Sequence, residues 1–423
     1  MEHTAFASSL QPPALLSPKH IDMILTGPAL TERFLVLDEF LVTHQALWRP
    51  KPFTFLVQPW AAEHPELAAW LSARSLEQAE AAHNHPEQLA APVPFPALAR
   101  QASALTALGE HPAQPLGALP QRLNIDMPGR KWQQINAFAE RLQFTQAPKH
   151  WLDWCSGKGH LGHLLAQGGQ QLTCLEYNPQ LVTAGQQLSE RLHLSAEHLQ
   201  QDVLAADAST RLHAGHSPVA LHACGDLHVR LLQLASASGC AQLAVAPCCY
   251  NRITTPTYQA LSAPARASQL SLSLDDLRLP LAETVTAGQR QRQQRNQSMA
   301  RRLAFDLLQR QQRGIDEYLQ TPSLPVSWLN KDFASYCQHL AELKGLELSG
   351  PIDWPGLEAA GWQRLAQVRN LELLRGLFRR PLELWLLLDR ALFLEEQGYQ
   401  VRLGTFCSHQ LTPRNLLLLA ERR

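Results

Sequence analysis

The sequence predicts an α/β protein with a mostly parallel, Rossmann-like sheet, a helical N-terminal module and a helical insertion. From His150 onward, the short apolar runs HWLDWC, QLTCLEY, PVALHAC and QLAVAPCC alternate with helical segments. Strands joined by crossover helices produce this alternation. In residues 1–126 and 256–380 this alternation of short apolar runs is missing, and segments such as LTERFLVLDEFLVTHQALW have only a helical pattern.

Length and pattern together divide the 423 residues into four segments. A chain of this length exceeds one ordinary core. Residues 1–126 form a helical module that ends in a proline-rich linker, and residues 127–255 form the α/β core. Residues 256–380 are expected to be a helical insertion. Residues 381–423 complete the core with a helix and the strand pair GYQVRLGTFC and RNLLLLAER.

Composition narrows the class of protein. Hydrophobic residues make up 45% and charged residues 17%, which is typical of a globular chain. No apolar stretch reaches the ~20 residues of a membrane-spanning helix, and no secretory leader is visible, so we expect a cytoplasmic protein. The eight cysteines are widely spread and are expected to be reduced. The net charge of zero does not by itself indicate a nucleic-acid partner.

The segment DWCSGKGHLGHLLAQ has the layout of a strand that ends in a glycine turn and opens into a helix. Asp153 stands near the strand end, and Gly157 and Gly159 allow a ligand to approach the backbone closely. Lys158 is followed by glycine instead of serine or threonine, which disfavours an ATP site. A NAD-dependent oxidoreductase is disfavoured because no third glycine completes a dinucleotide turn.

Two later acidic residues complete the expected nucleoside site. Glu176 ends the next strand, where an acidic side chain accepts ribose hydroxyls in such folds. Asp202 in LQQDVLAAD could meet an adenine edge, or could equally be a solvated loop residue. The ordered set of residues, more than any single one, predicts a cofactor that contains adenosine.

Three motifs in this order, DWCSGKGHLG, LHACGDLH and APCCYN, resemble those of the methyltransferase-like protein 25 family, a branch of class I S-adenosylmethionine methyltransferases. The lead-in MPGRKWQQI and the C-terminal LTPRNLLLLAER also resemble that family. A more distant resemblance is to tRNA ribose methyltransferases that carry a Cys-Cys-His-His loop. The family usually has a glycine where this chain has Cys155, so the turn has less freedom here.

The resemblance implies a seven-stranded, mostly parallel class I methyltransferase sheet with an antiparallel last strand. It implies S-adenosyl-L-methionine at the carboxyl edge and Glu176 on its ribose. The expected cofactor contacts are Asp153, Cys155, Gly157, Gly159, Glu176, Asp202 and His222.

Side chains after the fourth and fifth strands are the candidates for chemistry. LHACGDLH supplies His222, Cys224 and Asp226, and APCCYN supplies Cys248, Cys249, Tyr250 and Asn251. Asp226 or His222 could remove a proton from the acceptor, and Tyr250 could stack on a planar base or merely pack in the core. We expect Cys248 and Cys249 to shape the pocket.

Two other roles remain open for the cysteines. Cys224 or Cys248 could act as a nucleophile, as in methylation of pyrimidine carbon 5. His222, Cys224, Cys248 and Cys249 could also meet around zinc. We predict no metal, because adjacent cysteines rarely have the spacing of structural zinc sites. The candidate catalytic residues are therefore His222, Asp226, Cys248 and Tyr250.

An arginine-rich segment, residues 289–313, points to the substrate. It contains Arg290, Arg292, Arg295, Arg301, Arg302, Arg310 and Arg313 with Asp306 as the opposing charge. Such a helix suits phosphates, or else is a solvated or packed face. We expect methyl transfer to a macromolecule, with RNA, possibly tRNA or rRNA, preferred. A protein substrate, or a non-catalytic scaffold that binds protein or RNA, are the alternatives.

Overall fold

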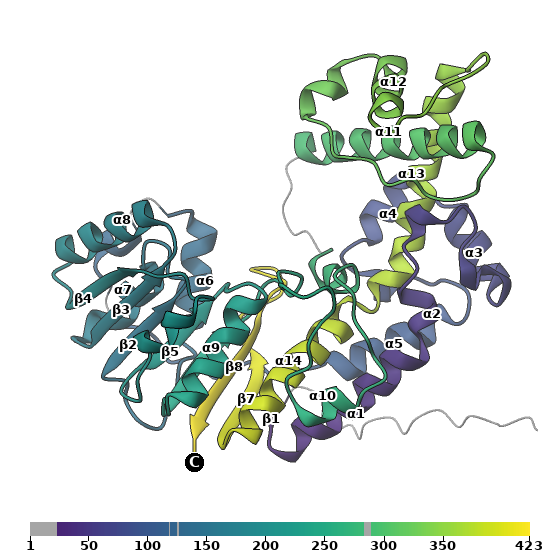
Figure 1. Cartoon of the computed structure of the whole chain (residues 1–423). Helices are drawn as coiled ribbons and strands as arrows, with labels where there is room; N and C mark the ends of the chain where they lie inside the picture. Colours follow the sequence, from purple (N-terminus) through teal and green to yellow (C-terminus); the bar gives the residue numbers. More distant parts are fainter. Residues whose placement is uncertain (1–22, 118, 125–126, 283–288) are drawn as a thin grey trace, which may run out of the picture.

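The structure, a computed structural model, describes residues 23–117, 119–124, 127–282 and 289–423 (Figure 1). One eight-stranded sheet in the order β1-β7-β8-β6-β5-β2-β3-β4 organises the chain. Five strands run parallel to one another: β2 (His150–Trp154), β3 (Gln171–Glu176), β4 (Ala196–Gln200), β5 (Ser217–Leu221) and β6 (Gln242–Ala246). This confirms the predicted α/β fold class.

The two C-terminal strands belong to the same sheet. Strand β8 (Leu416–Arg422) is antiparallel to both β6 and β7 (Tyr399–Thr405), and it lies between them. A short strand not predicted from the sequence, β1 (Leu25–Thr26), pairs antiparallel with β7 at the edge. The N-terminal segment therefore contributes directly to the sheet.

Helices cover both faces of the sheet. They are α6 (Gly129–Ala139), α7 (His160–Leu165), α8 (Pro179–Arg191) and α9 (Asp226–Ala237). Asn178 caps α8 by accepting a hydrogen bond from the Gln180 amide, and Pro179 fills the first helical position, as the sequence indicates. Side chains alternate along β2: Trp151 belongs to one buried core, and Leu152 and Trp154 belong to the other.

The N-terminal helices pack on helices from the other end of the chain. The N-terminal set is α1 (Pro28–Thr43), α2 (Gln45–Trp48), α3 (Pro65–Ser72), α4 (Leu76–Ala82) and α5 (Phe95–Thr106). Helix α14 (Arg379–Glu396) is almost entirely buried between α1, α5 and β7. The rings of Phe34 and Trp385 lie 5.2 Å apart across α1 and α14. These helices share one hydrophobic core with one face of the sheet.

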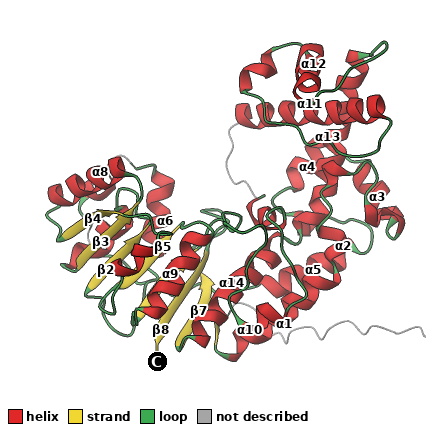
Figure 2. Ribbon diagram, viewed as in Figure 1, coloured by secondary structure: helices red, strands yellow, loops and turns green. Residues whose placement is uncertain are grey.

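A second group of helices forms an arm above this layer. It consists of α11 (Gln289–Arg313), α12 (Phe333–Leu343) and α13 (Trp354–Gly376), and α10 (Ala263–Ala267) lies on α14 below. Helices α11 and α13 approach closely at Gly361, where an added Cβ would lie 2.5 Å from the Ala300 carbonyl oxygen. Figure 2 shows the sheet with its helices as one arm of a V and these helices as the other.

Short 3₁₀ helices connect the larger elements. They are η2 (Pro52–Thr54), η3 (Pro59–Ala62), η4 (Pro86–Gln88), η5 (Gln121–Asn124), η6 (Ala166–Gly168), η7 (Ala206–Arg211), η8 (Asp276–Leu281) and η9 (Val326–Asn330). Within the described ranges, every helix is too short or too polar to cross a bilayer. The predicted compartment and the four-segment division stay predictions.

Candidate functional site

The turn between β2 and α7 holds three residues in the left-handed region: Cys155 at φ 57°, Gly157 at φ 60° and Gly159 at φ 77°. An added Cβ at Gly157 would meet no atom within 4 Å, so the turn borders open space there. At Gly159 it would lie 2.6 Å from Cε1 of His198. Gly157 therefore leaves room for a ligand, whereas Gly159 allows close packing against the protein interior.

Cys155 occupies a backbone conformation that normally selects glycine. A left-handed conformation costs a residue with a Cβ about 1–2 kcal/mol, which gives a physical reason for a glycine at this position in related turns. Burial, with the nearby Glu176 and Asp153 carboxylates, raises the pKa of the Cys155 thiol to about 12. The side chain is therefore a neutral thiol that packs against the larger core.

Asp153 lies beneath the turn, with 3% of its surface exposed. Its Oδ2 accepts a hydrogen bond of 2.9 Å from the Gly162 amide and so fastens the first turn of α7 to β2. Burial raises the pKa of Asp153 to about 7, although the Gly162 bond and the Lys131 charge oppose the shift. A direct contact of this carboxyl with a cofactor stays a prediction.

Glu176 joins the turns that follow β2 and β3. Its Oε2 accepts a hydrogen bond from the Gly157 amide and its Oε1 one from the Asn178 amide, both at 2.9 Å. A carboxylate has about four acceptor sites, so two remain for hydroxyl donors. Asp202 follows β4 at the same edge of the sheet, and its Oδ1 accepts from the Leu204 amide at 3.0 Å. Both arrangements suit a nucleoside, and the two roles stay predictions.

The loops after β5 and β6 are fastened to each other by their backbones. The Gly225 amide donates to the Cys249 carbonyl at 2.7 Å, and the Asp226 amide donates to the Arg252 carbonyl at 2.9 Å. A Cβ on Gly225 would lie only 1.9 Å from the Arg252 oxygen, so this contact requires glycine. Sequence reasoning did not single out Gly225, although the Cys-Gly-Asp turn after a strand was a usable signal.

The two candidate bases are already engaged in hydrogen bonds. Asp226 Oδ2 accepts from the amide and the hydroxyl of Thr254, at 2.8 and 2.9 Å. His222 Nε2 pairs with Gln134 Oε1 at 2.9 Å, a partner from α6 that sequence reasoning missed. Burial, and next the Lys131 charge, lower the pKa of His222 to about 4, so its ring is neutral at pH 7. Proton removal by either group stays a prediction.

Tyr250 does not reach the site surface. It is fully buried, with the Arg390 guanidinium 5.2 Å from its ring centre and His228 on another side. Burial also raises the pKa of its hydroxyl well above the ordinary value. The expectation that Tyr250 stacks on a base is therefore wrong for this structure, because helix α14 covers the position that follows β6.

Three thiols meet where β5 and β6 end. Cys224 Sγ lies 3.3 Å from Cys248 Sγ, which lies 3.7 Å from Cys249 Sγ. Hydrogen bonds from the other two thiols, supported by the charges of Arg414 and Arg252, lower the pKa of Cys249. The same contacts raise the pKa of Cys248.

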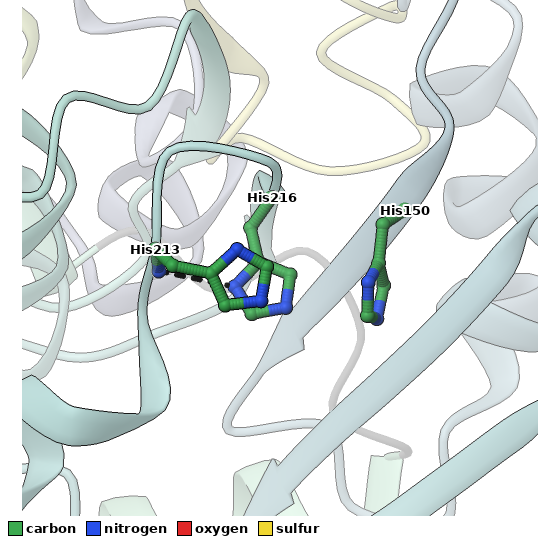
Figure 3. A group of neighbouring side chains, drawn as sticks. All are labelled: His150, His213 and His216. Atoms are coloured by element: carbon green, nitrogen blue, oxygen red, sulfur yellow. Dashed lines mark hydrogen bonds between the residues drawn. The ribbon is translucent and has the colours of Figure 1, made fainter.

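A second cluster, which the sequence did not indicate, lies at the opposite edge of the sheet. His150 begins β2, and His213 and His216 precede β5 (Figure 3). The rings of His213 and His216 are stacked with centroids 3.5 Å apart and planes 27° apart. His216 Nδ1 also accepts from the His213 amide at 3.3 Å. One ring nitrogen from each of the three histidines lies within 4.8 Å of the others, so this group could also hold a metal ion.

The seven arginines of α11 do not form one exposed stripe. Arg290, Arg292 and Arg295 are exposed, but Arg301 and Arg310 are buried. Arg301 donates to the Trp328 and Lys331 carbonyls, and Arg302 donates to the Thr321 carbonyl. Four of the seven thus have structural partners, since Arg310 binds Asp306 and Arg313 binds Gln309. The long phosphate-binding face expected from the sequence is reduced to the first two turns.

Comparison with known proteins identifies the core. Residues 130–256 match a family model described as a methyltransferase domain. Among solved structures, monomeric WbdD matches with a TM-score of 0.21 and 15% identity over 33% of each chain, so the match spans a third of that chain's length. Coclaurine N-methyltransferase, bound to N-methylheliamine and SAH, matches with a TM-score of 0.25 and 13% identity, over 81% of this chain and 89% of that one.

Both structural likenesses are too slight to carry an argument. The assignment of the methyltransferase domain rests on the family match and on the sheet order. The turn after β2, the carboxylate at the end of β3 and the antiparallel strand β8 lie where the class I methyltransferase fold has them. The narrower resemblance to the methyltransferase-like protein 25 family stays a prediction. Residues 130–256 therefore form a methyltransferase domain, a type of domain that transfers methyl groups from S-adenosylmethionine.

Proposed function

We propose that this methyltransferase acts on RNA. The observation that carries the proposal is a basic pocket of about 230 Å³ between α4 and the first turns of α11. Arg292, Arg295 and Arg369 line it, and Glu80 is the acidic residue among its described lining. Because Arg292 and Arg295 are exposed and have no opposing carboxylate in that lining except Glu80, they are available to phosphates.

A neighbouring pocket of about 690 Å³ extends this surface. It shares His83, Ala282 and Arg369 with the first and adds Lys51, Arg278 and Arg302. Part of its charge is neutralised, since Asp275 pairs with both Lys51 and Arg278. The positive charges of Arg292 and Arg295 are less neutralised than those of the second pocket. We therefore take these two arginines as the main phosphate contact.

The arrangement of the two arms supports a large substrate. Strand β8 points toward the C-terminus at the lower end of the sheet in Figure 1, and the parallel strands run opposite to it. The carboxyl ends of β2, β3, β5 and β6 therefore lie at the upper end, on the side of the helical arm. A chain of nucleotides could contact the arm and still reach the site.

At the site, this chain's residues would act mainly by positioning. The cofactor supplies an electrophilic methyl group, and the open space at Gly157 with the two free acceptor sites of Glu176 fits its nucleoside part. The fastened loops at Gly225 and Asp226 would hold the acceptor in line, which can account for much of a methyl-transfer rate.

The decisive experiment follows labelled methyl groups from S-adenosylmethionine into total RNA and total protein of the source cell. Glu176→Ala serves as the inactive control. We expect label that nuclease removes and protease does not. Label that survives nuclease and runs with a discrete protein band would show a protein substrate. No label in either fraction, together with intact cofactor binding, would support a non-catalytic scaffold.

A further inference from the structure

We propose that Cys224, Cys248 and Cys249 form a binding site for one zinc-like, thiophilic cation. This inference is independent of the RNA proposal, because it concerns only what the ends of β5 and β6 bind. It also differs from the expectation of no metal that adjacent cysteines suggest in the sequence.

The sulfur spacing matches a metal site. Zinc binds thiolate sulfur at about 2.3 Å in a tetrahedral arrangement, which places neighbouring sulfurs about 3.8 Å apart. Here the distances are 3.7 Å from Cys248 to Cys249 and 3.3 Å from Cys224 to Cys248, and all three sulfurs lie within 4.8 Å of one another. Small rotations of the side chains would bring them to the required spacing.

The scaffold already holds the ligands together. The bond from the Gly225 amide to the Cys249 carbonyl and the bond from the Asp226 amide to the Arg252 carbonyl fix the Cys224 loop to the Cys248 loop. The His222 amide adds a bond of 3.1 Å to the Ala246 carbonyl. Because the two loops are joined in this way, little chain entropy remains to be lost when a cation binds.

The local charge also suits a cation with three thiolates. Such a centre carries a net charge of about −1 with a divalent ion, and the positively charged Arg252 and Arg414 are near enough to Cys249 to interact with it electrostatically. The sulfurs are half-buried, so an ion could enter. Each thiol that still carries a proton would release it to the buffer on binding.

One coordination position would remain open. His222 is not within the group of converging ligand atoms, and its Nε2 is paired with Gln134. Three protein ligands and an open position are typical of catalytic zinc sites, whereas structural sites have four. The open position would lie at the carboxyl ends of β5 and β6, next to where the methyl acceptor is expected.

The test is reconstitution of the full chain with zinc or cobalt(II) under reducing conditions, followed by elemental analysis and absorption spectroscopy. We expect about one equivalent per chain and, with cobalt, thiolate charge-transfer bands that histidine ligands do not produce. Proton release, measured by calorimetry in two buffers, should accompany binding.

Matched variants locate the ion. Cys249→Ser and Cys224→Ser should lose the cobalt bands, whereas Cys155→Ser, which changes a half-buried thiol outside the cluster, should keep them. His216→Gln controls for the histidine cluster and should also keep them. Circular dichroism establishes that each variant is folded, and if a cysteine variant unfolds, the spectrum of the parent protein still decides.

Three results would overturn the proposal. The first is folded, reduced parent protein that takes up no zinc or cobalt. The second is metal that persists in Cys249→Ser and is lost in His216→Gln, which would place it at the other edge of the sheet. The third is a Cys224–Cys248 disulfide that mass spectrometry finds in place of any metal, which would make the cluster a redox pair.

Discussion

The Glu176 carboxylate accepts a hydrogen bond from the Gly157 amide at 2.9 Å, so one side chain holds together the turns that follow β2 and β3. We predict that Glu176→Ala weakens S-adenosylmethionine binding by about 1–3 kcal/mol, because an acceptor for the ribose hydroxyls and a support for the turn are both lost. Calorimetry measures this loss, and Glu190→Ala, an exposed glutamate of α8, is the control. Equal affinity of Glu176→Ala and the parent would remove Glu176 from the site.

Cys155 offers a test of backbone strain. At φ 57° a Cβ is unfavourable, so Cys155→Gly should be more stable than Cys155→Ala by about 1 kcal/mol, although both variants lose the thiol. Denaturant unfolding of the two variants gives the difference. If alanine were as stable as glycine here, the left-handed conformation would not be present in solution.

Gly225 is the glycine for which we expect the largest effect of substitution. In Gly225→Ala a new Cβ would clash with the Arg252 carbonyl oxygen, at 1.9 Å, and would also carry the strain of φ 53°. Gly239 has a φ of 70° but no contact closer than 4.0 Å, so Gly239→Ala isolates the strain alone. Gly225→Ala should cost at least about 2 kcal/mol more than Gly239→Ala. Similar unfolding midpoints for the two would contradict the tight loop contact.

Asp153 should make stability depend on pH. Its folded pKa of about 7 lies above the ordinary value, so the folded state holds the proton more strongly than the unfolded state. The free energy of unfolding should therefore fall as pH rises from about 4 through 7. In Asp153→Asn, which can still accept from Gly162, this decline should be smaller. Unfolding at pH 5 and pH 8 tests this, and parallel pH profiles of variant and parent would contradict it.

The exposed arginines of α11 test the substrate. Replacement of Arg290, Arg292 and Arg295 by Gln should flatten the salt dependence of RNA binding by up to about 2 in logarithmic slope, since each phosphate contact to a single strand contributes ~0.7. Cofactor affinity should stay unchanged, because the cofactor residues lie in another segment.

Arg301→Gln and Arg313→Gln provide the comparison, since these side chains have partners within the protein and line neither basic pocket. We expect them to alter stability more than the salt slope. Filter binding of labelled RNA at several salt concentrations measures the slope. A steep slope that survives the triple replacement would place the phosphate contacts elsewhere.

The sequence by itself determined the local features of this protein. The alternation of apolar runs indicated the parallel strands, and the glycine turn and Asn178 indicated where two helices begin. The order of the motifs indicated the edge of the sheet at which the site lies. These signals could be recognised because each depends on neighbouring residues alone. Only the tertiary structure decided how distant segments meet. Tyr250 is buried by α14, Arg301 and Arg302 of α11 bind the carbonyls of loops around that helix, and β1 comes from the far end of the chain. The meeting of Cys224 with Cys248, whose spacing depends on how two loops pack, likewise required three dimensions.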